Sequence, residues 1–224
     1  MTHKEAVSKL RPEPDNSRNL SFSELMQVTQ TDDVLRVKAK KQHIDASEFY
    51  TQILPELRDN CSYCVSTLTK NNKWKDLDVR SLASLLKHIE KHTAIGDDVF
   101  VAMNTFNTNN DLGRFSRQAK YADQGQCLWI DIDCDHDATI GQYRTKQAAL
   151  AAIGAITGGS AIPEPNYIVD SGNGLHLYWV FERPIGSREL KILATDFEKM
   201  ITTAGLKIDA KVTTDMARVL RAIG

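Results

Sequence analysis

The chain has 224 residues, of which 42% are hydrophobic and 25% charged, and its formal net charge is −1 at pH 7. This composition is typical of one sizeable globular domain, or of one domain with an extension. The near-zero charge argues neither for nor against nucleic acid, so any polyanion site must be a local basic patch. No apolar run could span a bilayer and no signal peptide opens the chain, so no membrane partner is expected. Four cysteines without a secreted framework favour a reduced, cytoplasmic setting.

Residues 1–42 are predicted to form a polar, partly disordered extension, and residues 43–224 to form the folded domain. Within the extension, Ser21–Met26 has the pattern of a short capped helix. The basic run Arg36–Lys41 is interpreted as a solvated face, and a supporting contact with nucleic acid is the less favoured interpretation.

The first half of the folded domain is predicted to be an αβαβ unit. Apolar residues recur at helical spacing from Phe49 to Leu57, and Cys61–Leu68 has the pattern of a strand. An amphipathic helix is predicted over Asp78–His92 and a second strand over Asp98–Met103. A long polar loop over Thr105–Gln126 follows, and it contains Arg114, Arg117 and Lys120.

The stretch Leu128–Asp135 alternates with a period of two and is predicted to be a half-buried strand. One face carries only apolar or small side chains, whereas the other carries Trp129, Asp131, Asp133 and Asp135. Neighbouring carboxylates repel one another, so such a face is either fully solvated or holds a cation. A hard divalent ion such as Mg²⁺ or Mn²⁺ prefers oxygen ligands of this kind. From the strand alone, a solvated acidic edge and a metal site are equally supported.

The rest of the chain predicts a helix, a hairpin, a second helix and a last strand. The corresponding ranges are Tyr143–Ile156, Asn166–Asp170 with its return strand Leu175–Phe181, Ser187–Ala204 and Leu206–Asp209. With the acidic strand, the order is βαββαβ, which is the ferredoxin-like or RNA-recognition-like split unit. The predicted fold is therefore α+β, with the αβαβ unit packed on this sheet.

This topology gathers polar residues that are far apart in the sequence. The first and third strands of such a sheet are central neighbours, and the fourth lies on the other side of the first. Asp131, Asp133, Asp209 and His176 should therefore meet on one open face, where the three aspartates would hold two metal ions for phosphoryl transfer. Residues expected to contact nucleotide phosphates are His176, the turn Ser171, Gly172, Asn173 and Gly174, and the arginines Arg218 and Arg221. For Arg114 and Arg117, a nucleotide or template contact and a solvated loop are nearly equally supported.

Three motifs in this order resemble the archaeo-eukaryotic primase superfamily, in the primase-polymerase branch of phages, plasmids and mobile elements. They are Trp129-Ile130-Asp131-Ile132-Asp133, Ser171–Trp179 around His176, and Leu206–Asp209 followed by Arg218 and Arg221. The resemblance implies template-directed nucleotide polymerisation with Mg²⁺ or Mn²⁺, nucleoside triphosphates, and a single-stranded DNA template or a primer-template. It also implies a bacterial or archaeal host cytoplasm and an associated or fused helicase. Gly174 departs from the family, because many members have serine there, and many members continue beyond the point where this sequence stops.

Two other functions compete with this interpretation. A metal-dependent nuclease or nicking replication initiator would favour two histidines on one strand or a tyrosine nucleophile, and only His176 is present in Leu175–Tyr178. A non-catalytic nucleic-acid-binding module would favour aromatic residues over paired acids on its sheet face. The pairs Cys61/Cys64 and His88/His92 are spaced too far apart for a compact zinc finger, so no zinc is expected.

Overall fold

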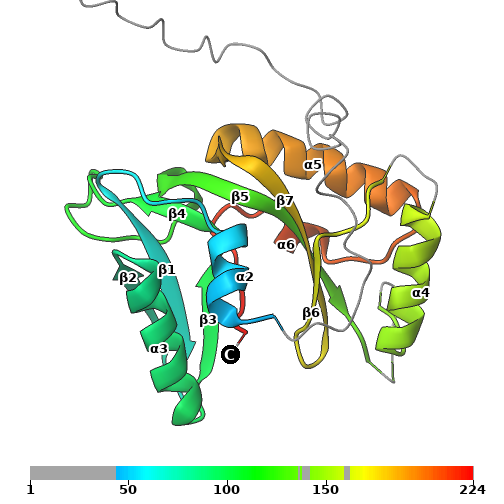
Figure 1. Ribbon diagram of the computed structural model, residues 1–224, viewed down its shortest axis with the longest axis horizontal. Coiled ribbons are helices and arrows are strands. Elements are labelled where there is room, and N and C mark those ends of the chain that lie inside the picture. Colours follow the sequence, from blue (N-terminus) through cyan, green and yellow to red (C-terminus); the bar gives the residue numbers. More distant parts are fainter. Residues whose placement is uncertain (1–43, 136, 138–141, 159–161, 224) are drawn as a thin grey trace, which may run out of the picture.

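The computed structural model describes residues 44–135, 137, 142–158 and 162–223, and Figure 1 shows their arrangement. The predicted extension 1–42, with its helix at Ser21–Met26 and its basic run at Arg36–Lys41, lies outside the described residues.

The described chain is α+β, with one mostly antiparallel sheet of eight strands. The strands are β1 Cys61–Leu68, β2 Trp74–Val79, β3 Asp98–Ala102, β4 Asn104–Asn107, β5 Ala122–Asp133, β6 Tyr167–Asp170, β7 Gly174–Gly186 and β8 Val219–Arg221. The helices are α2 Ala46–Ile53, α3 Leu82–Ala94, the short 3-10 turn η1 Ala119–Tyr121, α4 Lys146–Thr157, α5 Ser187–Thr203 and α6 Ala210–Thr213. The strand order is β6-β7-β5-β4-β1-β3-β8, and β2 also pairs with β1.

The N-terminal half contains two strands that the sequence did not predict. Strand β1 has the predicted bounds, but β2 pairs with it in an antiparallel hairpin, and α3 begins only at Leu82, where the Ser81 side chain accepts a hydrogen bond from the Ser84 amide. Strand β4 lies inside the predicted polar loop. The αβαβ prediction is therefore wrong in its strand count, because β2 is a half-exposed strand with many charged residues and β4 has only four residues.

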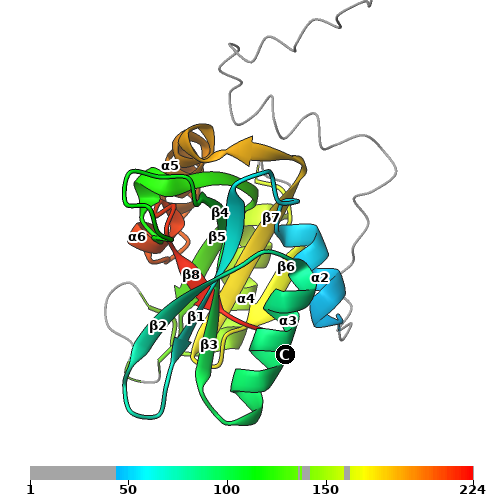
Figure 2. The same ribbon diagram turned by 90° about the vertical axis from the view of Figure 1, so that its left-hand side faces the viewer.

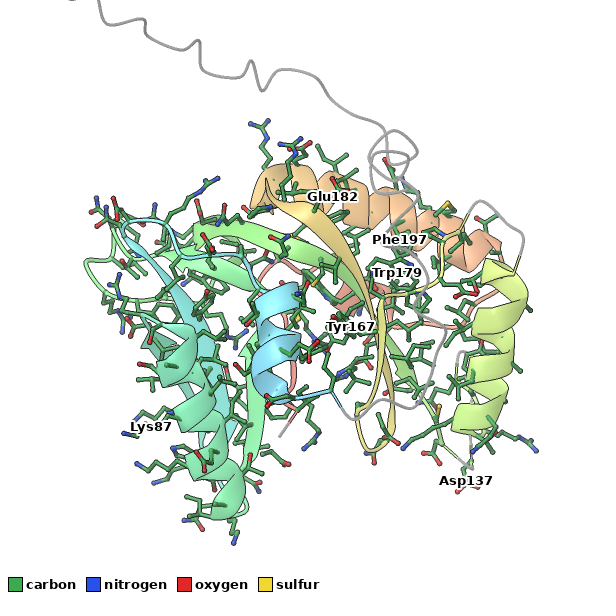
Figure 3. All side chains as sticks on the ribbon, viewed as in Figure 1. Lys87, Asp137, Tyr167, Trp179, Glu182 and Phe197 are labelled. Carbon is green, nitrogen blue, oxygen red and sulfur yellow. The ribbon has the colours of Figure 1, made fainter. Side chains whose placement is uncertain are left out.

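Helices cover both faces of the central pair β5 and β7. Trp179 of β7 packs edge-on against Phe197 of α5, with ring centroids 4.7 Å apart, and Figure 3 labels both. Its neighbour Tyr178 packs against Phe49 of α2, with centroids 5.3 Å apart. Successive residues of a strand point to opposite faces, so α5 covers one face and α2 covers part of the other. The predicted open face is consequently narrower than a bare sheet surface.

The last predicted strand, Leu206–Asp209, does not form. The segment stays close to β5 through one backbone hydrogen bond, in which the Asp209 amide donates to the Asp131 carbonyl over 3.1 Å. Asp209, four residues after Gly205, caps α6, which begins at Ala210, so no further pairing with β5 develops. The final strand is instead β8, which pairs with β3 at the far edge of the sheet. The specific ferredoxin-like arrangement is thus incomplete, although Asp209 reaches β5.

The two ends of the described domain lie together. The Ile223 amide donates a hydrogen bond of 3.1 Å to the Tyr50 hydroxyl of α2. Asp45, just before α2, and Ile223 also line one cavity of about 830 Å³ beside α3.

Candidate functional site

The acidic strand and the histidine strand bring Asp131 and His176 directly opposite each other. Strands β5 and β7 are antiparallel neighbours in which Asp131 pairs with His176 and Asp133 pairs with Gly174. Residues in register share a face, and the His176 Nε2 lies 3.6 Å from an Asp131 carboxylate oxygen. The side chains are 6% exposed for His176 and 16% for Asp131. The predicted convergence of these two residues is therefore present in the structure.

Burial and charge shift the pKa values of both residues. Burial raises the pKa of Asp131 to about 6, with further upward contributions from Asp133 and Asp209 and a downward one from Arg218. Burial lowers the pKa of His176 to about 4, and the charges of Arg221 and Arg218 act in the same direction. His176 is therefore neutral at pH 7, and its contact with Asp131 is not an ion pair.

Two buried nitrogen atoms at this site have no hydrogen-bond partner among the described residues. They are Nδ1 of His176 and Nε of Arg218. A buried polar atom without a partner costs free energy, about 1–3 kcal/mol each, so native proteins seldom leave one unless a ligand completes it. Both atoms belong to side chains whose charge or position affects Asp131 or His176. The pattern fits an anionic ligand that is held between β7 and the segment leading to β8.

Two neighbouring carboxylates act on Asp131. Asp131 is half-buried, Asp133 and Asp209 are exposed, and the carboxylates of Asp133 and Asp209 both raise the pKa of Asp131. The Asp209 carboxylate accepts a hydrogen bond from the Lys211 amide as the cap of α6. No group of three or more acidic, histidine or cysteine side chains among the described residues is already arranged to hold a metal ion. The donors are hard oxygens whose repulsion a divalent cation would relieve, so their chemistry fits Mg²⁺ or Mn²⁺.

The turn Ser171–Gly174 lies against the end of β5. The amide of Gly172, at φ +95°, donates to the Asp170 carboxylate over 2.8 Å, and the Asn173 carbonyl accepts from the Cys134 amide over 2.9 Å. A Cβ atom built on Gly174 would lie 2.0 Å from the carbonyl oxygen of Ile132. Any residue with a Cβ atom would therefore force the two strands apart at this position.

The four predicted arginines occupy different environments. Arg218 is half-buried, and its charge acts on both Asp131 and His176. Arg221 pairs with Asp98 over 2.5 Å and lies over the Phe100 ring at 5.2 Å. Arg117 is held by Asp76 over 3.1 Å and by the carbonyl of Ala217 over 2.6 Å. Arg114 is exposed in the loop before η1.

Asp76 on β2 is the centre of a network that the sequence reasoning missed. Its carboxylate accepts hydrogen bonds from Ser66 over 2.5 Å, from Trp74 over 3.1 Å and from Arg117 over 3.1 Å. Because Arg117 also binds the carbonyl before Arg218, the network connects β2 to the arginine segment. The alternation of Trp74, Asp76 and Asp78 was the signal that could have revealed it.

The cysteine and histidine pairs of the N-terminal half lie apart from Asp131. Cys61 and Cys64 are free and buried in β1, and burial raises the pKa of Cys61 to about 11 and that of Cys64 to about 12. His88 stacks on His92 with ring centroids 4.3 Å apart, and His92 Nδ1 lies 2.8 Å from Asp97.

Among the described residues, no helix combines the length and hydropathy needed to cross a bilayer.

No protein-family model and no curated protein matches the chain. The AEP domain of the cyanophage S-2L primase-polymerase is similar in structure, with a TM-score of 0.46 and 14% identity over 75% of this chain and 75% of that one. The polymerase domain of Mycobacterium tuberculosis ligase D in complex with DNA has a TM-score of 0.41 and 16% identity over 70% of this chain and 56% of that one. Because both TM-scores are below 0.5, the support for a function comes from the residues of the site.

Proposed function

We propose that the protein catalyses metal-dependent, template-directed nucleotidyl transfer from nucleoside triphosphates, as a DNA primase or polymerase. The observation that carries the proposal is the pairing of an acidic strand with a buried, neutral histidine. Asp131 and Asp133 lie on β5, and His176 stands opposite with an unpartnered Nδ1. Carboxylates suit the cations of phosphoryl transfer, and the unpartnered nitrogen suits a phosphate oxygen.

Each residue has a role that follows from its place. Asp131, Asp133 and Asp209 would hold Mg²⁺ or Mn²⁺, which when bound would stabilise the charge that develops on the transferring phosphate. His176 would orient the triphosphate through a neutral N–H, because its pKa of about 4 keeps the ring uncharged. Arg218 and Arg221 would supply fork-shaped donors to phosphate oxygens.

The remaining proposed contacts follow from where each residue lies. Amides and side chains of the turn Ser171, Gly172, Asn173 and Gly174 lie at the end of β5 and would approach the nucleotide. Arg117 is engaged by Asp76 and Ala217, so it would position Arg218 rather than bind nucleotide itself. Arg114 is exposed and would contact the template.

The cellular setting proposed with this function is replication of a phage, plasmid or mobile element in the cytoplasm of a bacterial or archaeal host. The partners would be a single-stranded DNA template or a primer-template, with a helicase fused to or associated with the protein.

The nuclease alternative is disfavoured by one observation. Tyr178, the tyrosine of the histidine strand, is 1% exposed and packs against Phe49. Burial raises its pKa far above the ordinary value, so its hydroxyl is a poor nucleophile.

The test is a primer-extension and primer-synthesis assay with single-stranded template, labelled nucleotides and Mg²⁺ or Mn²⁺. We expect Asp131→Asn and Asp133→Asn to lower product formation at least about 100-fold, because each removes a charged metal ligand. Asp135→Asn is the matched control, since Asp135 is exposed two residues further along the chain and its carboxylate accepts a hydrogen bond from the Asp137 amide over 3.0 Å. Full synthesis by Asp131→Asn would remove the assignment, and template degradation in place of growth would favour a nuclease.

A further inference from the structure

An exposed aromatic residue stands on β2, where it shares the Asp76 carboxylate with Arg117. Six large hydrophobic residues in the described chain are exposed, and Trp74 on β2, at 45%, is the only aromatic one among them. Its ring lies 5.1 Å from that of the half-buried Phe100 on β3. Trp74 also donates a hydrogen bond to Asp76 over 3.1 Å, so the indole is held in place rather than free to rotate.

The aromatic pair continues into the arginines of the site. The Arg221 guanidinium lies 5.2 Å from the Phe100 ring. Arg117 pairs with Asp76 on the strand of Trp74 and also donates to the Ala217 carbonyl, next to Arg218, over 2.6 Å. Trp74, Phe100 and Arg221, here named the aromatic platform, therefore form a continuous row on β2, β3 and β8. One end of this row is Arg221 on β8, three residues after Arg218, and the other end is Trp74 on the β1–β2 hairpin.

The charge around the platform favours a polyanion. The acidic residues near it each have a basic partner: Asp76 pairs with Arg117 over 3.1 Å, Asp98 with Arg221 over 2.5 Å, and Asp78 with Arg80 over 4.0 Å. At the tip of the hairpin, Lys70 and Lys73 are exposed, and no acidic side chain of the described residues pairs with them. Figure 2 shows this hairpin extending at the lower left, away from α5.

The hairpin tip is a fixed turn. The Thr69 amide donates to the Lys73 carbonyl over 3.0 Å, and the Asn72 amide donates to the Thr69 carbonyl over 2.8 Å. Asn72 adopts φ 56°, a conformation that asparagine tolerates better than most residues. The two lysines are therefore presented at a defined distance from the platform.

We propose that the aromatic platform and the hairpin tip bind the single strand of nucleic acid that leaves the candidate site, with Trp74 stacking on a base and Lys70 and Lys73 contacting phosphates. The proposal deepens the proposed function, on which its description as a template path rests. Stacking on aromatic rings combined with basic residues is how proteins hold single strands without reading their sequence. A double strand does not fit this role, because its bases are not free to stack on an indole.

The protein itself carries a probe for the proposal. Of its three tryptophans, Trp129 and Trp179 are each 1% exposed, so Trp74 alone is accessible to a base. We would titrate the full chain with a 12-nucleotide oligothymidine and with an abasic strand of equal length. Tryptophan fluorescence and the anisotropy of a dye on the strand would be followed. The wild type should bind oligothymidine about ten-fold or more tightly than the abasic strand, and its tryptophan emission should be quenched only by the former.

Variants separate stacking from charge. Trp74→Leu should lose the preference for oligothymidine and leave affinity for the abasic strand unchanged, whereas Trp74→Phe should keep most of the preference. Both variants lose the bond to Asp76, so their comparison isolates the aromatic ring. Replacing Lys70 and Lys73 by Gln should weaken binding of both strands and lower the salt dependence by roughly one to two in log–log slope. Ile192→Ala, at an exposed apolar residue on α5, is the matched control and should change nothing.

The outcomes distinguish this proposal from the proposed function. If Trp74→Leu binds oligothymidine as the wild type does, or binding leaves the emission unquenched, the platform is overturned even if Asp131→Asn abolishes synthesis. If binding depends on Trp74 but the wild type makes no product, the platform stands as a single-strand site and the polymerase function is overturned.

Discussion

At the scale of single residues, Asp131 combines a structural cost with its proposed role. Burial and two neighbouring carboxylates raise its pKa from 3.8 to about 6. A carboxyl group with a raised pKa contributes stability below about pH 4 that is lost as the pH rises through 6. Above pH 6, the Asp131 carboxylate is charged in both the folded and the unfolded protein. Its charge is less favourable in the folded state, unless a cation neutralises it.

The first prediction at this scale concerns stability without metal. In EDTA at pH 7.5, Asp131→Asn should stabilise the protein by about 2 kcal/mol, which raises the melting temperature by roughly 4–8 °C. At pH 4.5 the two proteins should melt within about 2 °C of each other, because Asp131 is then mostly protonated. Excess Mg²⁺ should raise the melting temperature of the wild type more than that of the variant. Equal melting temperatures at both pH values would contradict the raised pKa.

The neutral state of His176 contributes with the opposite sign. Its lowered pKa stabilises the fold above pH 6.5, and this contribution is lost as the pH falls toward 4. Between pH 4 and 6, lowering the pH decreases the free energy of unfolding through His176 and increases it through Asp131. Comparing Asp131→Asn with the wild type, in which His176 is common to both, isolates the aspartate.

At the scale of elements, the close approach of β5 and β7 determines which residue can stand opposite Asp133. Gly174 has no room for a Cβ, whereas nothing lies within 4 Å of a Cβ built on Gly186 of the same strand. Gly174 departs from the pattern of the family that the motifs resemble, and the close approach of the Ile132 carbonyl gives this departure a steric reason. The histidine two residues later nevertheless occupies the expected place in the register.

Gly174→Ser tests this constraint. We expect a loss of about 1–3 kcal/mol in the free energy of unfolding, measured by urea denaturation, because the two strands must separate to accept the side chain. Gly186→Ala is the matched control and should lie within about 0.5 kcal/mol of the wild type. A Gly174→Ser variant of wild-type stability would show that the strands can separate freely, and it would restore the family's serine as an option.

The elements also show what the sequence could predict. The bounds of β1 and the start of α5 at Ser187 were predicted correctly, because an apolar run and a change to helical periodicity are local signals. Ser187 does not cap the helix, since Gly186 is the N-cap and the Ser187 hydroxyl donates to the Ala122 carbonyl. Strands β2 and β4 were missed because their hydrophobic contrast is weak. The predicted strand at Leu206–Asp209 was wrong because contacts between residues far apart in the sequence determine which segment pairs with the sheet. The chain there turns into α6, and β3 receives β8 instead.

At the scale of the whole molecule, the candidate site depends on parts that are distant in the sequence. Arg117 precedes β5, yet it joins Asp76 of β2 to the carbonyl next to Arg218. The order of motifs allowed Asp131, His176 and Asp209 to be grouped in advance. The sequence could not show that the hairpin β1–β2 supports the arginine segment, because hydrogen bonds between distant loops leave no periodic pattern.

A double-mutant cycle tests whether Arg117 acts through Arg218. Arg117→Gln and Arg218→Gln should each raise the KM for nucleoside triphosphate, and the double variant should be little worse than Arg218→Gln alone. An Arg117 that binds nucleotide independently would instead give effects that add. The same variants should retain the preference for oligothymidine over the abasic strand, since Trp74 is intact in each.

The hydrogen bond from the Ile223 amide to the Tyr50 hydroxyl has a consequence for any larger assembly. Entry to the folded unit and exit from it occur at one spot beside α3, so anything tethered to either end would be anchored at the same corner. A short linker could also join residue 223 to residue 44 and allow new ends to be opened in a surface loop, without passing the chain through the sheet.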